Sequence, residues 1–164
     1  MIGLTFSGMA QDDEAKGYIV KVGDIAPDFE MNLLNGQKVK LSELKGKLVM
    51  LQFTASWCGV CRKEMPFIEN EIWQEHKDKD FALFALDLDE PKEKAEALIA
   101  ATGITYPIAL DAEGKIFTKY ALKESGVTRN VIVNKEGEII FLTRLFNREE
   151  FNEMKKVIEA ELNK

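Results

Sequence analysis

The pattern of apolar and polar positions divides the chain into short strands and amphipathic helices. The segments 47–53 and 81–88 are apolar and have the length of buried strands, and shorter runs lie at 18–22, 108–110 and 131–133. Strands that alternate with helices are typical of a parallel sheet with helices on its faces. The pattern therefore predicts an α/β protein built on one central sheet.

Two turn sequences predict hairpins. Asn35 and Gly36 separate two strand-like segments near the N-terminus, and a pair of this type is a strong hairpin signal. Residues 134–137 form a four-residue turn between the apolar segments 131–133 and 138–142. This second hairpin adds an antiparallel edge, so the predicted sheet is mixed.

Helices are predicted between and after the strands. The first carries an apolar stripe, but Pro66 lies inside it, and a proline there removes a hydrogen bond and kinks the helix. Pro91 suits the first turn of the second helix, and Gly103 suits its C-terminal cap. The predicted segments are a single turn at 42–46 and helices at 59–76, 92–101, 116–122 and 148–162.

Composition and charge narrow the class of function. The 164 residues are 46% apolar and 30% charged, a globular balance with enough apolar material for one core. The formal net charge of −6 excludes a basic nucleic-acid footprint and a polybasic membrane patch. No apolar run reaches the roughly 20 residues of a membrane span. We expect one domain over residues 17–164 that acts as a monomer, without nucleic acid or a membrane span.

The first residues do not fit this domain. Residues 1–10 carry no charge, and Gly8 to Ala10 have the small-x-small look of a signal-peptidase site. No basic segment precedes them and the apolar part is short, so we interpret them as the tail of a signal peptide whose start is missing. A flexible N-terminal extension is the alternative. In either case residues 1–16 are expected to lie outside the core.

The two cysteines lie at the junction of a strand and a helix. Cys58 follows the apolar segment 47–53, and Cys61 is three positions further on. A bridge that encloses two residues removes little loop entropy from the unfolded chain, so stabilisation is a poor reason for the pair. Sites in sheets of this kind collect at the carboxyl ends of the strands, where Cys58 lies. Spacing and placement together indicate thiol–disulfide redox chemistry.

The two cysteines are expected to have different roles. Cys58 would lie at the helix N-terminus, where unpaired amides and the helix dipole stabilise a thiolate, so it is the candidate attacking cysteine. Cys61 would be shielded one turn later and would resolve the mixed disulfide. Glu64 shares its helical face and is the candidate for proton transfer, with a solvated surface carboxylate as the alternative. Trp57 is expected to cover the pair, with core packing as the alternative.

Other polar residues offer weaker signals. His76, the only histidine, is expected at the surface. A closed zinc site needs four ligands, and only two cysteines exist, so no metal or cofactor is expected. Asp87, Asp89 and Glu90 are interpreted as solvated residues at the end of a strand.

The cysteine motif carries a family resemblance. Residues 57–61, with Phe53 ahead and Glu64 and Pro66 behind, resemble the thioredoxin-like superfamily. More narrowly, they resemble the extracytoplasmic TlpA/ResA-type thiol–disulfide oxidoreductases, which are related to the AhpC/TSA domain. Residues 22–29 are similar to the entry segment that these proteins share with peroxiredoxins.

The resemblance covers residues 18–164 and implies both a fold and a function. The implied fold is α/β and thioredoxin-like, with a mixed central sheet flanked by helices, an N-terminal hairpin and a central insertion after Asp89. The implied partners are protein disulfide or dithiol substrates and an upstream thiol–disulfide donor, in the periplasm or another extracytoplasmic space. The family also marks Glu64 as a modulator of cysteine acidity.

The chain departs from this family at three positions. Gly59 and Val60 stand between the cysteines, where the second residue is usually proline. Gln52 stands where thioredoxin has a buried aspartate. Thr128 stands at the position of the family's cis-proline, and we expect a trans bond between Val127 and Thr128 because a cis bond there costs about 2.5–4 kcal/mol.

The loop that contains Thr128 is expected to lie over the cysteine pair and to offer backbone hydrogen bonds to an incoming peptide. The residues expected to contact substrate are Trp57, Gly59, Val60, Val127 and Thr128.

Two other functions compete with the oxidoreductase. A peroxiredoxin-type peroxidase needs a Pro-x-x-x-Thr/Ser-x-x-Cys frame, but Ala55 stands where its Thr or Ser belongs, and Met50 or Leu51 stands near its proline. A binding module would hold a protein or metal through Cys58 and Cys61 without turnover, and the altered loop at Thr128 gives this alternative some support.

Overall fold

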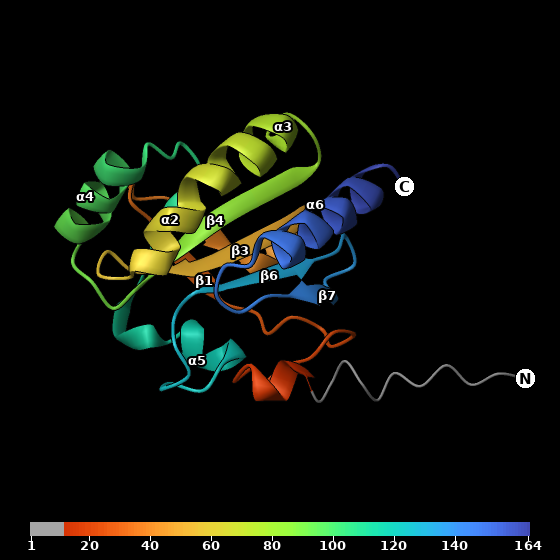
Figure 1. Cartoon of the computed structure of the whole chain (residues 1–164), viewed down its shortest axis with the longest axis horizontal. Helices are drawn as coiled ribbons and strands as arrows, with labels where there is room; N and C mark the ends of the chain where they lie inside the picture. The colour runs from red at the N-terminus through yellow and green to blue at the C-terminus, as the bar shows by residue number, and fades with distance from the viewer. Residues whose placement is uncertain (1–11) are drawn as a thin grey trace, which may run out of the picture.

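Seven strands form one mixed sheet in the computed structural model, which describes residues 12–164 (Figure 1). Their spatial order is β2-β1-β5-β4-β3-β6-β7. Strands β3, β4 and β5 are parallel, and the pairs β1–β2, β1–β5, β3–β6 and β6–β7 are antiparallel. The predicted mixed α/β sheet is therefore confirmed. The strands are β1 (Glu30–Leu33), β2 (Lys38–Lys40), β3 (Leu48–Thr54), β4 (Phe81–Leu88), β5 (Ile108–Asp111), β6 (Arg129–Val133) and β7 (Ile139–Leu142).

Helices cover both faces of this sheet. Helices α2, α4 and α6 pack on one face, and the short helix α5 lies on the other (Figure 1). Helix α2 continues into a π-helical turn and then into α3. The helices are α2 (Gly59–Ile68), the π turn (Glu69–Trp73), α3 (Gln74–His76), α4 (Lys92–Thr102), α5 (Phe117–Tyr120) and α6 (Arg148–Leu162), with 3-10 turns at Leu41–Leu44 and Ala112–Gly114.

Strand β3 lies at the centre of the sheet, between β4 and β6, and all seven of its residues are buried. Because side chains alternate along a strand, Leu51 and Phe53 face one core while Leu48 and Met50 face the other. Gln52 continues the second set, so its polar side chain is buried on the face that α2 covers. The strand that leads to Cys58 thus carries a polar group beneath the helix.

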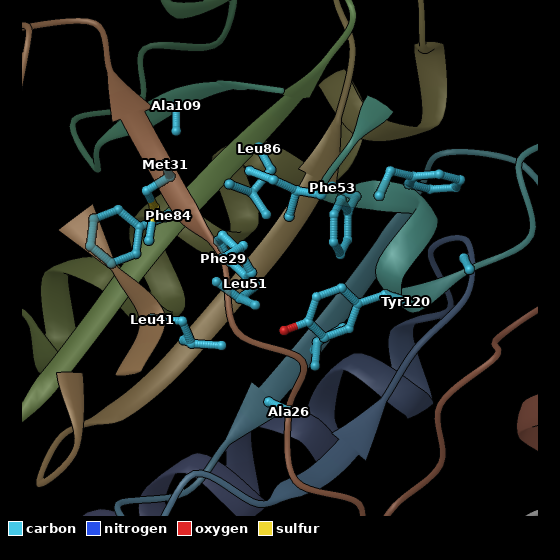
Figure 2. Close-up of a cluster of buried hydrophobic side chains, with 14 of the residues drawn as sticks. Ala26, Phe29, Met31, Leu41, Leu51, Phe53, Phe84, Leu86, Ala109 and Tyr120 are labelled. Atoms are coloured by element: carbon cyan, nitrogen blue, oxygen red, sulfur yellow. The ribbon is translucent and has the colours of Figure 1, made fainter. Parts of the chain in front are cut away.

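Aromatic rings fix the end of β3 on the opposite face. Phe53 packs edge to face on Phe117, with ring centroids 5.5 Å apart. The centroid of the Phe53 ring also lies 5.7 Å from that of Tyr120 (Figure 2). The Tyr120 hydroxyl donates to the carbonyl of Pro27 at 2.7 Å. These contacts join α5 and the N-terminal segment to the strand that ends just before the cysteine pair.

The strand predicted at 18–22 is wrong. Within this segment Tyr18 alone forms a bridge, to Ala121. Ala121 directly follows the short helix α5, so the partner offers too little extended chain for a ladder. The side chain anchors the segment instead, because the Tyr18 hydroxyl donates to the carbonyl of Thr143 at 2.6 Å.

Residues 12–16, which were expected outside the core, contact the domain instead. Residues 12–15 form a helical turn, and Asp13 is buried. Lys16 pairs with Glu150 of α6 at 3.1 Å. The signal-peptide interpretation of residues 1–10 concerns a part of the chain outside the described residues.

His76 is buried, so its predicted surface position is wrong. His76 follows Ile72 at i+4 and Ile68 at i+8, so it shares the helix face that these buried residues turn toward the sheet. Its ring packs edge to face on Phe81, with centroids 5.9 Å apart. Burial lowers the pKa of His76, as does the nearby Lys79.

Candidate active site

The cysteine pair lies at the N-terminus of α2, just past the carboxyl end of β3. Cys58 is the N-cap residue, and its extended backbone has φ −87° and ψ 103°. Its amide donates to the carbonyl of Ala55 at 3.1 Å, which closes the turn between strand and helix. Its Sγ accepts a hydrogen bond from the amide of Cys61 at 3.2 Å. An N-cap side chain in this position satisfies an amide that the helix leaves unpaired.

Cys58 and Cys61 form a disulfide, with their Cα atoms 5.3 Å apart. Cys58 is 7% exposed, whereas Cys61 is fully buried. Cys58, the cysteine at the helix N-terminus, is therefore the one of the two that reaches the surface. This asymmetry is what an exchange reaction with one attacking and one resolving cysteine needs.

The loop that contains Thr128 lies against both sulfurs, as expected. Thr128 Oγ1 is 3.1 Å from Cys58 Sγ and 3.2 Å from Cys61 Sγ. Val127 and Thr128 are both buried. The bond between them is trans, in agreement with the prediction, and residues 12–164 contain no cis peptide.

Glu64 is buried, so the alternative of a solvated surface carboxylate is wrong. Its Oε1 accepts a hydrogen bond from Asn130 Nδ2 at 2.6 Å, and its Oε2 has no partner among the described residues. Burial raises the pKa of Glu64 to about 7, although the hydrogen bond from Asn130 opposes this rise. The carboxyl lies on the buried side of α2 and makes no hydrogen bond to either sulfur within residues 12–164.

A polar layer between α2 and the sheet surrounds Glu64. Gln52 of β3 lies opposite Asn130 of β6 in the sheet register. Gln52 Oε1 accepts a hydrogen bond from the Tyr106 hydroxyl at 2.7 Å, and Thr143 Oγ1 accepts one from Asn130 Nδ2 at 3.1 Å. Sequence analysis missed Asn130, Tyr106 and Thr143. The available signal was a polar residue in the short β6 strand, which the register places beside Gln52.

Asp87 is fully buried, so the interpretation of this residue as solvated is wrong. Asp89 is exposed and Glu90 is half-buried. Burial raises the pKa of Asp87 to about 8, and the neighbouring Glu90 adds to the rise. Burial also disfavours ionised Glu90, but hydrogen bonds from the Ser56 amide (2.8 Å) and hydroxyl (2.6 Å) outweigh it, and its pKa is lowered. A neutral and a charged carboxyl thus lie close together at the end of β4, and the charged one, Glu90, holds the turn before Cys58.

Asp87→Asn is expected to remove a pH dependence of stability. Because its folded-state pKa is raised, neutral Asp87 contributes stability at low pH that is lost as the pH rises through about 8. Between pH 6 and 9, the free energy of unfolding of the oxidised wild type, measured by urea denaturation, should fall by about 2 kcal/mol more than that of Asp87→Asn. Asp80→Asn is the control, because Asp80 is exposed, and its stability should depend on pH as that of the wild type does. Equal slopes for all three proteins would contradict the buried neutral acid.

The surface around Cys58 is apolar and open. Trp57 is 65% exposed, so the alternative of core packing is wrong. Val60 is 38% exposed, and Gly59, which lies between Cys58 and Val60 in the sequence, is exposed as well. These residues lie at the rim of the site, while Glu64 and Gln52 lie beneath the helix.

Two further features of residues 12–164 bear on function. None of their helices combines the length and apolar character that crossing a membrane requires. Within the same residues, no three His, Cys, Asp or Glu side chains gather in a way that suits a metal ion.

Known proteins are similar to this chain in both sequence and fold. Residues 22–142 match the AhpC/TSA family. The thiol-disulfide oxidoreductase ResA of Bacillus thuringiensis is 32% identical over 140 residues, which cover 85% of this chain and 77% of that protein. The solution structure of a candidate protein disulfide isomerase from Bacteroides thetaiotaomicron has a TM-score of 0.87 and 57% identity, and the match covers 90% of this chain and 94% of that one. A candidate thiol:disulfide interchange protein DsbE from Chlorobium tepidum has a TM-score of 0.78 and 30% identity, over 87% of this chain and 99% of that one.

These matches favour the oxidoreductase over both of its rivals. The relatives named above carry thiol–disulfide names, and Ala55 still lacks the hydroxyl of the peroxidase frame. The cysteine pair forms the disulfide that such chemistry requires. The chain belongs to the AhpC/TSA family, and within it to the thioredoxin-like, TlpA/ResA-type thiol–disulfide oxidoreductases.

Proposed function

We propose that the protein exchanges disulfides with protein substrates through Cys58 as the attacking cysteine and Cys61 as the resolving one. The observation that carries this assignment is the position of Cys58 at a helix N-terminus, where 7% of the residue remains exposed, beside a fully buried Cys61. The Cys58 thiolate attacks a substrate disulfide, forms a mixed disulfide and expels one substrate thiolate. The Cys61 thiolate then attacks Cys58 Sγ, which restores the internal disulfide and releases the second substrate sulfur as a thiolate.

Glu64 is proposed as the group that exchanges protons during this cycle. A carboxyl with a pKa of about 7 is present in both protonation states near neutral pH. Its position on the buried face of α2 places it one helical turn from Cys61. Glu64 contacts neither sulfur directly, so its influence on the cysteines is electrostatic or passes through bound water.

A substrate peptide is proposed to lie between the N-terminus of α2 and the loop at 126–128. Trp57, Gly59 and Val60 provide an exposed rim on one side. On the other side, the backbone N–H and C=O of Val127 have no hydrogen-bond partner among the described residues. An extended peptide pairs with free backbone groups of this kind, while pockets and apolar rims select its side chains. Thr128 completes this side of the proposed site.

The compartment and the partners are also proposals. The TlpA/ResA-type relatives support an extracytoplasmic, periplasmic location. There the protein would act as a monomer and exchange electrons with an upstream thiol–disulfide donor. Fractionation of cells that express the full gene tests the location, and recovery in the cytosol would contradict it.

The proposed function predicts a preference for disulfides over peroxide. With dithiothreitol as reductant, the wild type should accelerate the reduction of insulin disulfides well above the uncatalysed rate. With hydrogen peroxide as oxidant and the same dithiol, turnover should remain near the background. The two rates are measured at equal protein concentration and pH 7. A peroxidase rate that exceeds the insulin rate would overturn the proposal in favour of a peroxiredoxin-type enzyme.

A further inference from the structure

The Thr128 hydroxyl bridges the two reactive sulfurs. Its Oγ1 is almost equally far from both, at 3.1 Å and 3.2 Å, and has no other hydrogen-bond partner among the described residues. Because a disulfide sulfur carries no hydrogen, the hydroxyl is the donor in this oxidised state. A hydroxyl has one hydrogen, so it serves one sulfur at a time and changes sulfur by rotation about its C–O bond.

The backbone on either side holds this hydroxyl in place. Arg129 Nε donates to the carbonyl of Gly126 at 2.9 Å, and its Nη2 donates to the carbonyl of Ser125 at the same distance. The carbonyl of Thr128 accepts a hydrogen bond from the amide of Leu145 at 3.0 Å. Arg129 is fully buried, with its guanidinium 4.5 Å from the centre of the Tyr18 ring. These contacts fix a loop that lacks the conformational restraint of a proline.

The setting makes a hydrogen bond to a thiolate effective. Thr128 is 3% exposed, so water competes little for its hydroxyl or for the sulfur beside it. Hydrogen bonds to ionised groups are about twice as strong as those between neutral groups. This hydroxyl, at 3.1 Å, and the Cys61 amide, at 3.2 Å, are the two hydrogen-bond donors recorded at Cys58 Sγ among the described residues. A proline at position 128 would supply no donor at all.

We propose that Thr128 is a catalytic residue whose hydroxyl donates to whichever sulfur carries the negative charge. In the dithiol it stabilises the Cys58 thiolate. When the thiolate of a reducing partner attacks Cys58 Sγ, a disulfide forms between that partner and Cys58. The Cys58–Cys61 bond breaks, and the negative charge moves to Cys61 Sγ. The hydroxyl then rotates to Cys61, and no proton is transferred in this step. The roles of the two cysteines rest on the proposed function, but the hydrogen bond itself rests on the two distances.

The test compares Thr128→Val, which keeps the shape without the hydroxyl, with Thr128→Ser, which keeps the hydroxyl. Reduced proteins are alkylated with iodoacetamide between pH 4 and 9, and the rate at Cys58 is followed by mass spectrometry. Thr128→Val should react about tenfold more slowly than the wild type at the acidic end of the profile, with its midpoint moved to higher pH. Thr128→Ser should stay within about threefold of the wild type. Reduction of the disulfide by dithiothreitol at pH 7 should slow in Thr128→Val by a similar factor, because the expelled Cys61 thiolate loses its donor.

Three outcomes would overturn the proposal. The first is a pH profile of Cys58 alkylation in Thr128→Val that equals that of the wild type. The second is a loss of alkylation rate in Thr128→Ser as large as that in Thr128→Val. The third is a lower melting temperature of Thr128→Val with an unchanged alkylation profile, which would indicate a role in packing alone. If circular dichroism shows that Thr128→Val does not fold, Thr128→Ala replaces it with the same expected profile. Both reagents are small molecules, so the result holds even if the protein fails to reduce insulin. A failure of the proposed function and a failure of this inference are therefore distinguishable.

Discussion

Cys58→Ser is expected to reduce disulfide exchange to the background rate, because a serine hydroxyl is not ionised at neutral pH and cannot form a disulfide. The remaining Cys61 is fully buried, so it cannot take over the attack on a protein disulfide. Cys61→Ser should also lose turnover, but for a different reason. It keeps Cys58, the cysteine that reaches the surface, and stops at the mixed disulfide.

Insulin reduction and thiol alkylation separate the two variants. Both should fail to accelerate insulin reduction. With iodoacetamide at pH 7, native Cys61→Ser should be alkylated rapidly at Cys58, whereas Cys61 in native Cys58→Ser should react only when urea exposes it. Urea-unfolded samples are the control, because both thiols should then react alike. Rapid alkylation of Cys61 in the folded protein would contradict the assignment of the two roles.

Glu64→Gln is expected to raise the stability at alkaline pH and to change the pH dependence of Cys58. Burial raises the folded-state pKa of Glu64 to about 7, so the neutral acid contributes stability that is fully present below the ordinary glutamate range. That contribution is lost as the pH rises through about 7, and its size is about 3 kcal/mol. Glutamine stays neutral and does not lose it.

Urea denaturation of the oxidised proteins at pH 4.5 and pH 8 measures the effect. The decline in free energy of unfolding between these values should be smaller in Glu64→Gln by about that amount. Glu75→Gln is the matched control, since Glu75 is an exposed glutamate further along the same helical segment. In the reduced protein, the alkylation profile of Cys58 should shift in Glu64→Gln alone. A pH dependence of stability and alkylation equal to that of the wild type would rule out Glu64 as the proton partner.

The structure connects these effects to one local arrangement. The buried strand β3 ends at Thr54, and a turn held by Glu90 through Ser56 delivers Cys58 to the first turn of α2. The same helix buries Glu64 against Asn130. The strand, the turn and the helix therefore determine both the accessibility of Cys58 and the pKa of Glu64. A substitution that shifts the start of α2 is expected to change both.

The regular elements were predictable because their patterns repeat over many residues. The apolar alternation of β4 and the amphipathic stripe of α6 gave their observed bounds, Phe81–Leu88 and Arg148–Leu162. His76 was misplaced because its charged neighbours suggested a surface position, although it follows Ile72 at the i+4 spacing of the buried helix face. The strand predicted at 18–22 was wrong because a strand needs an extended partner, and its partner residue, Ala121, directly follows a short helix.

The site was predictable in its cysteines and less so in its polar surroundings. Strand-to-helix placement identified Cys58, Cys61 and Glu64 from neighbouring positions along the chain. Asn130 reaches Glu64 from a distant segment, and the burial of Asn130 and Asp87 depends on how helices pack on the sheet, which local sequence does not show. A polar residue in an apolar strand predicts exposure unless its partners are known, because burying it unpaired is costly.

The most direct test of the central claim is to trap mixed disulfides and map them. Cys61→Ser and Cys58→Ser are incubated with an oxidised protein substrate, quenched with acid, digested without reductant and analysed by mass spectrometry. The account predicts abundant mixed disulfides through Cys58 in Cys61→Ser and almost none through Cys61 in Cys58→Ser. Comparable adducts through Cys61, or none through Cys58, would contradict it.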